Sequence, residues 1–135
     1  MAVRWAVRPL PMATRKSTLW VPERAEIIFI QYNPAVGGEM PDDHPMLVIS
    51  TKVFAERTGL VVGFPMTHAE RHADNPFAIV APGARGETGY LLTHQPKSFD
   101  WRARHARPHP WGTGHTRLLT AALKRFDTVF GVCSH

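Results

Sequence analysis

The feature that most constrains the fold of this chain is a succession of short apolar runs, each closed by residues that favour turns. The run at 26–32 is rich in β-branched and aromatic residues and stops at Asn33-Pro34, which is the pattern of a β-strand followed by a turn. Because the connections between runs resemble hairpins, we expect a mainly antiparallel sheet. The pattern predicts further strands at 46–51, 60–64, 77–81 and 89–94, a helical turn at 53–57, and a polar loop at 67–75.

The end of the chain changes from this strand pattern to a helical period. Apolar residues between Leu118 and Phe130 recur three and four positions apart, with charged residues between them. This spacing predicts an amphipathic helix from Thr116 to Phe130, which Gly131 ends. A small antiparallel barrel of about five to seven short strands covered by one helix fits this order, in the α+β class but mainly β.

The length of 135 residues allows one domain and a short tail. Residues 1–18 contain Arg and Lys, two prolines and no acid, and they carry +4 of the net charge of +5. No strand or helix period is visible there, so we expect a flexible basic extension at 1–18 and a barrel domain at 19–135.

Several classes of protein are excluded by composition. The single cysteine, Cys133, rules out an internal disulfide and a cysteine-rich zinc site. No apolar run is long enough to span a membrane, and the N-terminus has no apolar stretch typical of a secretion signal. We therefore expect a cytoplasmic protein without membrane contact.

A second basic cluster lies at 97–107, where Lys97, Arg102, Arg104 and Arg107 face only Asp100. Local positive charge of this kind is typical of a surface that binds a polyanion, since phosphate contacts depend on local rather than total charge. A solvated edge of the sheet explains the same residues equally well.

The sequence also contains a set of phrases in a recognisable order. Residues 20–24 read Trp-Val-Pro-Glu-Arg, and residues 95–104 read Gln-Pro-Lys-Ser-Phe-Asp-Trp-Arg-Ala-Arg. Together with the segments between them, these phrases resemble the MazF/PemK (Kid) toxins over 19–130, and the second phrase is the most specific part. The intervening matches are Asn33 to Glu39, His44 to Ser50, Thr58-Gly59-Leu60 and Pro65-Met66-Thr67.

The resemblance implies a compact SH3-like barrel, of the kind that the CcdB toxins share, and a homodimer. It implies metal-independent, sequence-selective cleavage of single-stranded RNA, in which the 2′-hydroxyl of the substrate attacks and no cofactor is needed. It further implies a cognate antitoxin with an acidic, disordered tail. Apolar residues such as Phe54 and Leu60 independently favour a dimer, because a small barrel leaves such residues exposed.

The resemblance also assigns candidate site residues. The active-site threonine of the family matches Thr67, and its catalytic arginine in the Trp-Arg-Ala-Arg phrase matches Arg104. Where the family has an arginine before the proline of the second strand, this chain has His44. Histidine suits proton transfer better, because an unperturbed imidazole has a pKa of about 6.5 whereas arginine stays protonated. The residues matched to RNA binding are Glu39, Gln95, Lys97 and Arg102.

Other readings of these residues stay open. The replacement at His44 also fits an inactive RNA-binding homologue, Thr67 also fits a hydroxyl that caps a turn, and the shared barrel also fits a CcdB-like toxin that binds gyrase. Trp101 suits base stacking or core packing, with packing favoured. His68 and His72 stand four residues apart, as zinc ligands on a helix do, but in a polar loop we expect no metal there.

Overall fold

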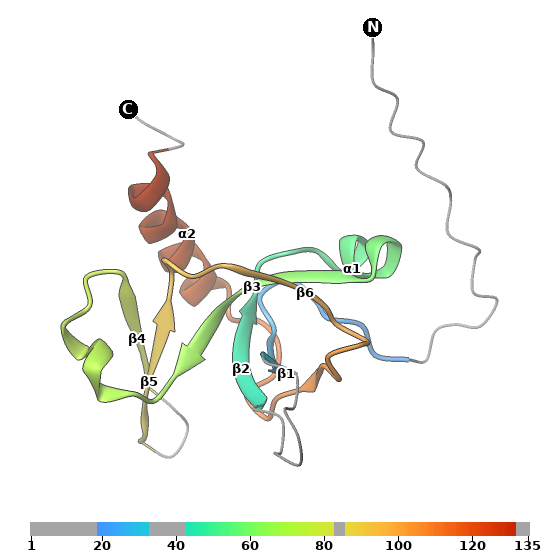
Figure 1. Cartoon of the computed structure of the whole chain (residues 1–135), viewed down its shortest axis with the longest axis horizontal. Helices are drawn as coiled ribbons and strands as arrows, with labels where there is room; N and C mark the ends of the chain where they lie inside the picture. Colours follow the sequence, from blue (N-terminus) through green and yellow to red (C-terminus); the bar gives the residue numbers. More distant parts are fainter. Residues whose placement is uncertain (1–18, 33–42, 83–85, 132–135) are drawn as a thin grey trace, which may run out of the picture.

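The computed structural model describes residues 19–32, 43–82 and 86–131 (Figure 1). The predicted extension at 1–18 and the candidate residue Glu39 lie outside these residues. The elements in chain order are β1 (Ile27–Gln31), β2 (Asp43–Val48), α1 (Lys52–Thr58), β3 (Leu60–Thr67), η1 (Glu70–Asp74), β4 (Ala78–Pro82), β5 (Thr88–Leu92), β6 (Lys97–Asp100), β7 (Arg107–Pro108) and α2 (Thr116–Phe130).

All strand pairs are antiparallel, in the order β4-β5-β3-β2-β1-β7, with β6 paired to β3. The turn between β6 and β7 closes the curved sheet: the Trp101 amide donates to the Gly59 carbonyl at 3.2 Å, and the Gln31 amide donates to the Arg104 carbonyl at 3.1 Å. The predicted fold class, a mainly β antiparallel barrel with a C-terminal helix, is confirmed.

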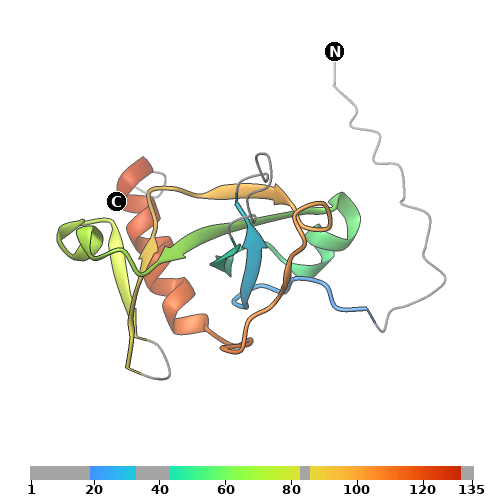
Figure 2. The same cartoon turned by 60° about the horizontal axis from the view of Figure 1, so that its bottom comes forward.

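Strand β3 is the longest strand and connects the two halves of the molecule (Figure 2). It pairs with β6 at Leu60–Gly63 and with β5 at Met66–Thr67. Pro65 lies in the gap between these two partners, where a missing N–H costs no ladder bond on that edge. The prediction that the strand stops before Pro65 is therefore wrong, because the proline marks a change of partner rather than an end.

Strand β2 begins at Asp43, three residues before the predicted start at Met46. Its pairing with β1 continues to Gln31 and Asp43, past the point where its ladder with β3 ends. Further along, β2 and β3 approach so closely that a Cβ at Gly63 would lie 2.5 Å from the Leu47 carbonyl oxygen and 2.6 Å from Cγ of Met46. Glycine is thus required at this crossing.

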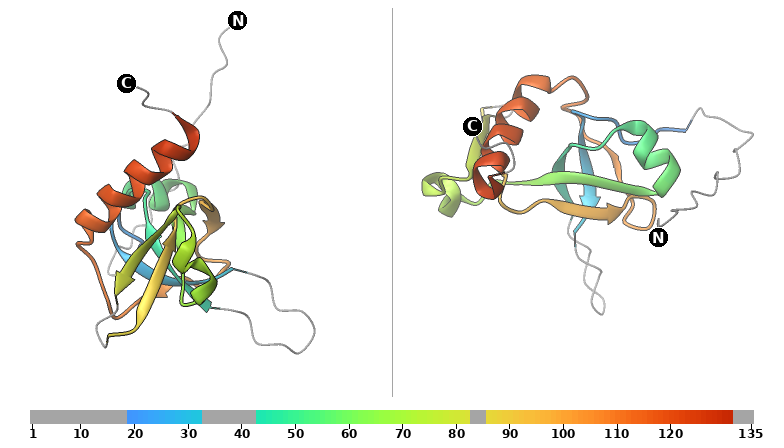
Figure 3. Two further views of the ribbon diagram at one scale, coloured as in Figure 1. Left: turned by 90° about the vertical axis from the view of Figure 1, so that its left-hand side faces the viewer. Right: turned by 90° about the horizontal axis from the view of Figure 1, so that it is seen from above.

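Two hydrophobic clusters lie on opposite faces of the central strands. The cluster inside the barrel contains Ile28, Met46 and Trp101. The other lies between the strands and α2, where Leu119 and Ala122 pack against Leu47 and other strand residues (Figure 3). Helix α2 has the bounds that the apolar spacing predicts, because its buried stripe supplies a cover for the outer face of the sheet.

Three further elements were not predicted from the sequence. β6 and β7 were not predicted, and the predicted polar loop at 67–75 contains the 3-10 helix η1. Exposed and half-buried residues alternate along β6, and its polar side chains hide the strand pattern. No helix among the described residues is long and apolar enough to cross a membrane.

Candidate functional site

Four side chains from distant parts of the sequence form a continuous cluster at one end of the barrel. The ring of Tyr32 lies edge-on to the His44 ring, with centroids 5.1 Å apart, and edge-on to the Phe99 ring at 5.4 Å. The guanidinium carbon of Arg104 lies 4.3 Å above the centre of Phe99. We call these four residues the Tyr32 cluster. It connects two predicted catalytic residues, His44 and Arg104, through two aromatic rings.

The Tyr32 hydroxyl connects β2 to β3 at the point where the two strands separate. It donates to the Pro45 carbonyl oxygen at 2.8 Å, and the Met66 backbone donates a hydrogen bond to it. Burial raises the pKa of Tyr32 far above its usual value, an effect that the Met66 bond only partly offsets. Tyr32 therefore stays protonated and acts as a fixed bridge between the two strands rather than as a base.

His44 is half-buried on β2, directly across from Ile30 of β1. Its neighbour Asp43 forms an ion pair with Arg107, with 2.7 Å between Oδ2 and Nη2. This pair ties the start of β2 to the segment of β7, so the backbone that carries His44 is held on both sides. The imidazole is thus placed by the strand and by the edge of Tyr32.

Arg104 is positioned by a tight turn after β6. Oδ1 of Asp100 accepts hydrogen bonds from the backbone amides of Arg102 at 3.1 Å and Ala103 at 2.9 Å. His105 adopts a φ of +54°, a left-handed conformation that is uncommon outside glycine. The turn points Arg104 back towards the barrel.

The guanidinium of Arg104 is anchored at the end of β1. Its Nη1 donates to the carbonyl oxygen of Gln31 at 3.2 Å and to that of Tyr32. These two bonds use one terminal nitrogen, and a guanidinium carries further N–H donors on its other two nitrogens. Arg104 can therefore be held by the fold and still contact an anionic ligand.

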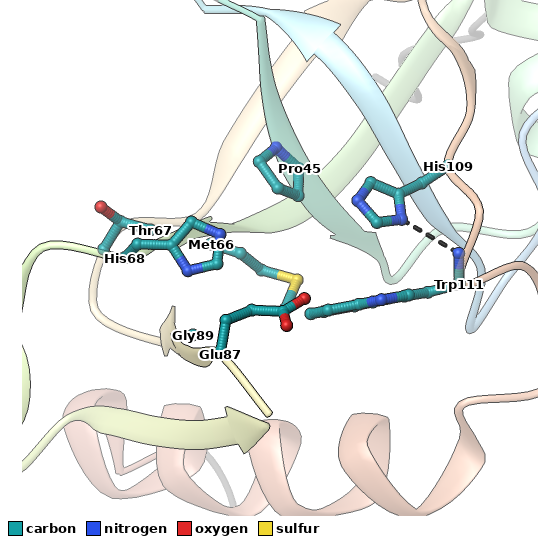
Figure 4. A pocket seen from close by; sticks show the side chains of 8 residues that line it. All are labelled: Pro45, Met66, Thr67, His68, Glu87, Gly89, His109 and Trp111. Carbon is teal, nitrogen blue, oxygen red and sulfur yellow. Dashed lines mark hydrogen bonds between the residues drawn. The ribbon is translucent and has the colours of Figure 1, made fainter. Parts of the chain in front are cut away.

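Thr67 lies at the end of β3 and, like Pro45, the neighbour of His44 in β2, it borders a small pocket. The ladder of β3 with β2 ends at the pair of Pro65 with Met46, and Thr67 pairs with Tyr90 of β5. The Thr67 hydroxyl accepts from the Ala69 amide at 3.1 Å, so it does cap a turn. In Figure 4 this hydroxyl points away from the small pocket that Thr67 also borders.

The predicted RNA-binding residues that the structure describes lie on β6 and its flanking turns. Lys97 begins β6 opposite Gly63 and is half-buried, whereas Arg102 and Gln95 are exposed. The Arg102 guanidinium covers the Trp101 ring at 4.4 Å, and the Gln95 amide lies 3.2 Å from Nε2 of His94. The fourth residue of this set, Glu39, lies outside the described residues.

The base-stacking alternative for Trp101 is wrong. Only 7% of Trp101 is exposed, and its indole N–H donates to the Ala55 carbonyl oxygen at 3.0 Å. The ring also meets Trp20 edge-on, with centroids 6.0 Å apart. Trp101 therefore belongs to the barrel core, as the packing interpretation expected.

The two loop histidines contact different partners. Nδ1 of His68 lies 2.9 Å from the Thr88 carbonyl oxygen, and Nδ1 of His72 lies 3.3 Å from the Asn75 amide. Within 19–32, 43–82 and 86–131, no group of three or more His, Cys, Asp or Glu residues could hold a metal ion.

Sequence reasoning missed Tyr32 and Phe99, which join His44 to Arg104. Both residues sit in segments that the sequence analysis had already singled out, the end of a predicted strand and the basic phrase. The available signal for Phe99 was its spacing of two residues from Lys97, which places both side chains on one face if the segment is a strand.

Comparison with known proteins gives consistent matches. The family model described as "PemK-like, MazF-like toxin of type II toxin-antitoxin system" matches residues 23–130. The endoribonuclease toxin MazF of Escherichia coli (strain K12) is 31% identical over 87 residues, which cover 64% of this chain and 76% of the relative.

Solved structures agree. Crystal structures of MazF (Form-I) and of MazE-MazF (Form-II) from Deinococcus radiodurans are each 25% identical and match 84% of this chain, with TM-scores of 0.69 and 0.72 and coverage of 99% and 98% of those chains. The match at 23–130 spans most of the barrel and the whole of α2. The chain therefore belongs to the PemK-like, MazF-like toxin family of type II toxin-antitoxin systems.

Proposed function

We propose that this toxin is a metal-independent endoribonuclease that cleaves single-stranded RNA at selected sequences. The observation that carries this proposal is the Tyr32 cluster, in which the edge-on rings of Tyr32 and Phe99 lie between the imidazole of His44 and the guanidinium of Arg104. A proton-transfer group and a fixed cation within one cluster are the minimum that phosphoryl chemistry on RNA requires.

The reaction is an in-line transesterification. The substrate 2′-hydroxyl loses its proton to a base and its oxygen attacks the adjacent phosphorus, while the bond from phosphorus to the 5′-oxygen breaks. The leaving 5′-oxygen takes up a proton. The products are a 2′,3′-cyclic phosphate and a 5′-hydroxyl end, and neither water nor a cofactor is consumed.

The positions of the residues support the following roles. His44 transfers the proton, because an imidazole ring can both accept and donate one. Arg104 neutralises the charge that develops on the phosphate, and Thr67 supplies a hydroxyl donor at the end of β3. The RNA strand lies over Gln95, Lys97 and Arg102 on and beside β6, with Glu39 at the segment between β1 and β2.

Relatives support this proposal. The E. coli relative carries the name endoribonuclease toxin MazF, and 31% identity over most of its length makes shared chemistry the simplest inference. This chain differs from the family pattern at His44, where the family carries arginine. We place the activity in the cytoplasm, where RNA substrates are present.

We infer two protein partners for this toxin. MazF from D. radiodurans was crystallised with its cognate antitoxin MazE, and we infer an antitoxin for this chain whose acidic, disordered tail covers the basic turn around Arg102 and Arg104. The second partner is another copy of this chain. Val80 and Phe130 are 57% and 55% exposed, and apolar surface of this kind favours association.

Light scattering tests the dimer. At micromolar concentration the protein should have twice the chain mass of 15.1 kDa. A monomer across a dilution series would contradict the dimer without affecting the assignment of the RNA site.

The test of the nuclease uses purified protein, a mixture of single-stranded RNAs and EDTA, with the new ends mapped. We expect cleavage in EDTA at a restricted set of sequences, with 2′,3′-cyclic phosphate and 5′-hydroxyl ends. Cleavage that EDTA abolishes and zinc restores would contradict the mechanism. An inactive wild type that binds RNA, together with an active His44→Arg variant, would instead identify an inactive homologue.

A further inference from the structure

A small pocket lies on the face of β2 and β3 that is turned towards α2 (Figure 4). Its volume is about 70 Å³, against the roughly 10–15 Å³ that one water needs, so a few waters or the amino-bearing edge of one base can fill it. Four separate segments supply its walls. The lining residues are Pro45, Met66, Thr67, His68, Glu87, Gly89, His109 and Trp111.

His109 offers the pocket a hydrogen-bond donor. Its Nδ1 accepts from the Trp111 backbone amide at 3.0 Å, which requires that Nδ1 carry no proton. Burial, with smaller effects of His115 and His68, lowers the pKa of His109 and keeps the ring neutral. The proton of the neutral ring therefore sits on Nε2, and Figure 4 shows this second nitrogen facing the open space beside Pro45.

Glu87 offers an acceptor from the opposite side. Figure 4 shows its carboxylate between Met66 and the edge of the Trp111 ring. Glu87 comes from the hairpin of β4 and β5, and His68 is tied to the same hairpin by the contact of its Nδ1 with the Thr88 carbonyl at 2.9 Å. The pocket thus combines an aromatic wall, an acceptor and a donor.

We propose that this pocket binds one base of the RNA strand and selects a base with an exocyclic amino group, namely adenine, cytosine or guanine. The Trp111 ring supplies a stacking surface, the Glu87 carboxylate accepts from the amino group, and Nε2–H of His109 donates to a neighbouring acceptor of the base. Uracil has no amino group and would turn a carbonyl oxygen towards the carboxylate. The inference rests on the proposed RNA-cleaving function.

The pocket and the Thr67 hydroxyl lie on opposite sides of the end of β3. Successive side chains of a strand point to opposite faces, so Met66 borders the pocket while its neighbour Thr67 directs its hydroxyl away from it. An RNA strand that crosses the end of β3 can therefore bring a phosphate to one face and a base to the other.

A cationic peptide side chain is the main competing occupant, because an aromatic ring and a carboxylate also attract a cation. Such a side chain would meet the Nε2–H of His109 head-on, and that hydrogen repels a cation. A base satisfies both the donor and the acceptor, so the geometry favours the base.

The test measures binding of short 2′-O-methyl oligonucleotides of A, C or U by fluorescence anisotropy. These oligonucleotides cannot be cleaved, because the attacking oxygen is blocked. The wild type should bind the A or C oligonucleotide about tenfold more tightly than the U oligonucleotide, the discrimination typical of a good base contact. Glu87→Gln should reduce this preference to less than threefold, since a carboxamide also donates to a uracil carbonyl.

Two further variants complete the experiment. Glu56→Gln makes the same change at an exposed residue of α1 and should keep the wild-type preference. Trp111→Leu keeps apolar packing beneath α2 but removes the ring, and should weaken binding of every oligonucleotide at least fivefold. Thermal unfolding of each variant verifies that it is folded.

The outcomes separate this inference from the proposed function. If the wild type cleaves RNA but Glu87→Gln and Trp111→Leu bind all oligonucleotides as the wild type does, the base pocket is wrong and the nuclease stands. If the wild type neither cleaves nor binds RNA, both fail. If N-acetyl-lysinamide shifts the indole N–H resonance of Trp111 in NMR spectra whereas adenosine monophosphate does not, the pocket binds a peptide and the inference is overturned.

Discussion

The two faces of β2 and β3 carry different chemistry although their residues alternate along the same strands. On one face His44 and Arg104 are joined through aromatic rings, and a cation is anchored to backbone carbonyls. On the other face a pocket contains the carboxylate of Glu87 and the neutral ring of His109. In the proposed mechanism, strand alternation keeps the Glu87 carboxylate on the face opposite to the phosphate, while the base site and the phosphate site stay close together.

Arg104→Ala should slow RNA cleavage strongly through a change confined to the Tyr32 cluster. Loss of a fixed cation that stabilises a developing negative charge costs about 10²- to 10³-fold in rate. Binding of RNA should also depend less on salt, with a slope smaller by about 1. Single-turnover cleavage and salt titrations measure both, and Arg117→Ala, at an exposed position of α2, is the matched control. An unchanged rate would exclude Arg104 from the site.

Gly63→Ala should damage both faces together. The new Cβ would overlap the Leu47 carbonyl and the Met46 side chain, and overpacking of this kind costs about 1–3 kcal/mol of unfolding free energy. Urea unfolding measures the loss. Ser98→Ala, on the exposed face of the neighbouring β6, should change it by less than about 0.5 kcal/mol. A Gly63→Ala protein as stable as the wild type would show that the strands can move apart at this crossing.

Tyr32→Phe should weaken the Tyr32 cluster and spare the pocket. The change leaves the Pro45 carbonyl and the Met66 amide without the hydroxyl that bridges them, at a cost of about 1–2 kcal/mol. Tyr90→Phe makes the same change at a buried tyrosine of β5 that has no hydroxyl hydrogen bond within the described residues, and should cost less. Denaturant unfolding measures the loss of stability, and oligonucleotide binding measures the effect on the pocket. If Tyr32→Phe no longer bound the A oligonucleotide more tightly than the U oligonucleotide, the two faces would not be independent.

The smallest effect concerns the pH dependence of stability on the pocket side. The pKa of His109 is lowered in the folded protein, so the folded state binds this proton less readily than the unfolded state. The free energy of unfolding is therefore highest above about pH 6.5, the pKa of an unperturbed histidine. It decreases as the pH falls below this value, because the unfolded state takes up the proton first. Melting temperatures between pH 7.5 and 5.5 should fall more for the wild type than for His109→Gln; equal slopes would contradict a neutral His109.

Much of the fold follows from patterns that the sequence displays directly. The helical period of Leu118 to Phe130 predicts α2 to the residue, because one apolar stripe is sufficient to cover the sheet. The strands at 26–32 and 89–94 are also predicted close to their observed positions. The continuation of β3 through Pro65 is not predictable locally, since it depends on a change of partner between β6 and β5.

The site is predicted less completely than the fold. The resemblance points to His44, Thr67 and Arg104, but it contains no information on the rings of Tyr32 and Phe99 that join two of them. The pocket is invisible in the sequence, because Met66, Glu87 and Trp111 are brought together only by strand pairing and by the approach of α2. Residues that gain a role through tertiary contacts leave no local signal.

The most direct test of the account is the pH dependence of single-turnover RNA cleavage by the wild type and by His44→Ala. If His44 transfers the proton, the wild-type rate depends on pH through an ionisation that His44→Ala lacks, and His44→Ala is slower by about 10²- to 10⁴-fold. Its affinity for an uncleavable oligonucleotide stays within a few fold, because Arg104 still contacts the phosphate. Equal rates for the two proteins, with a flat pH profile, would contradict the central claim.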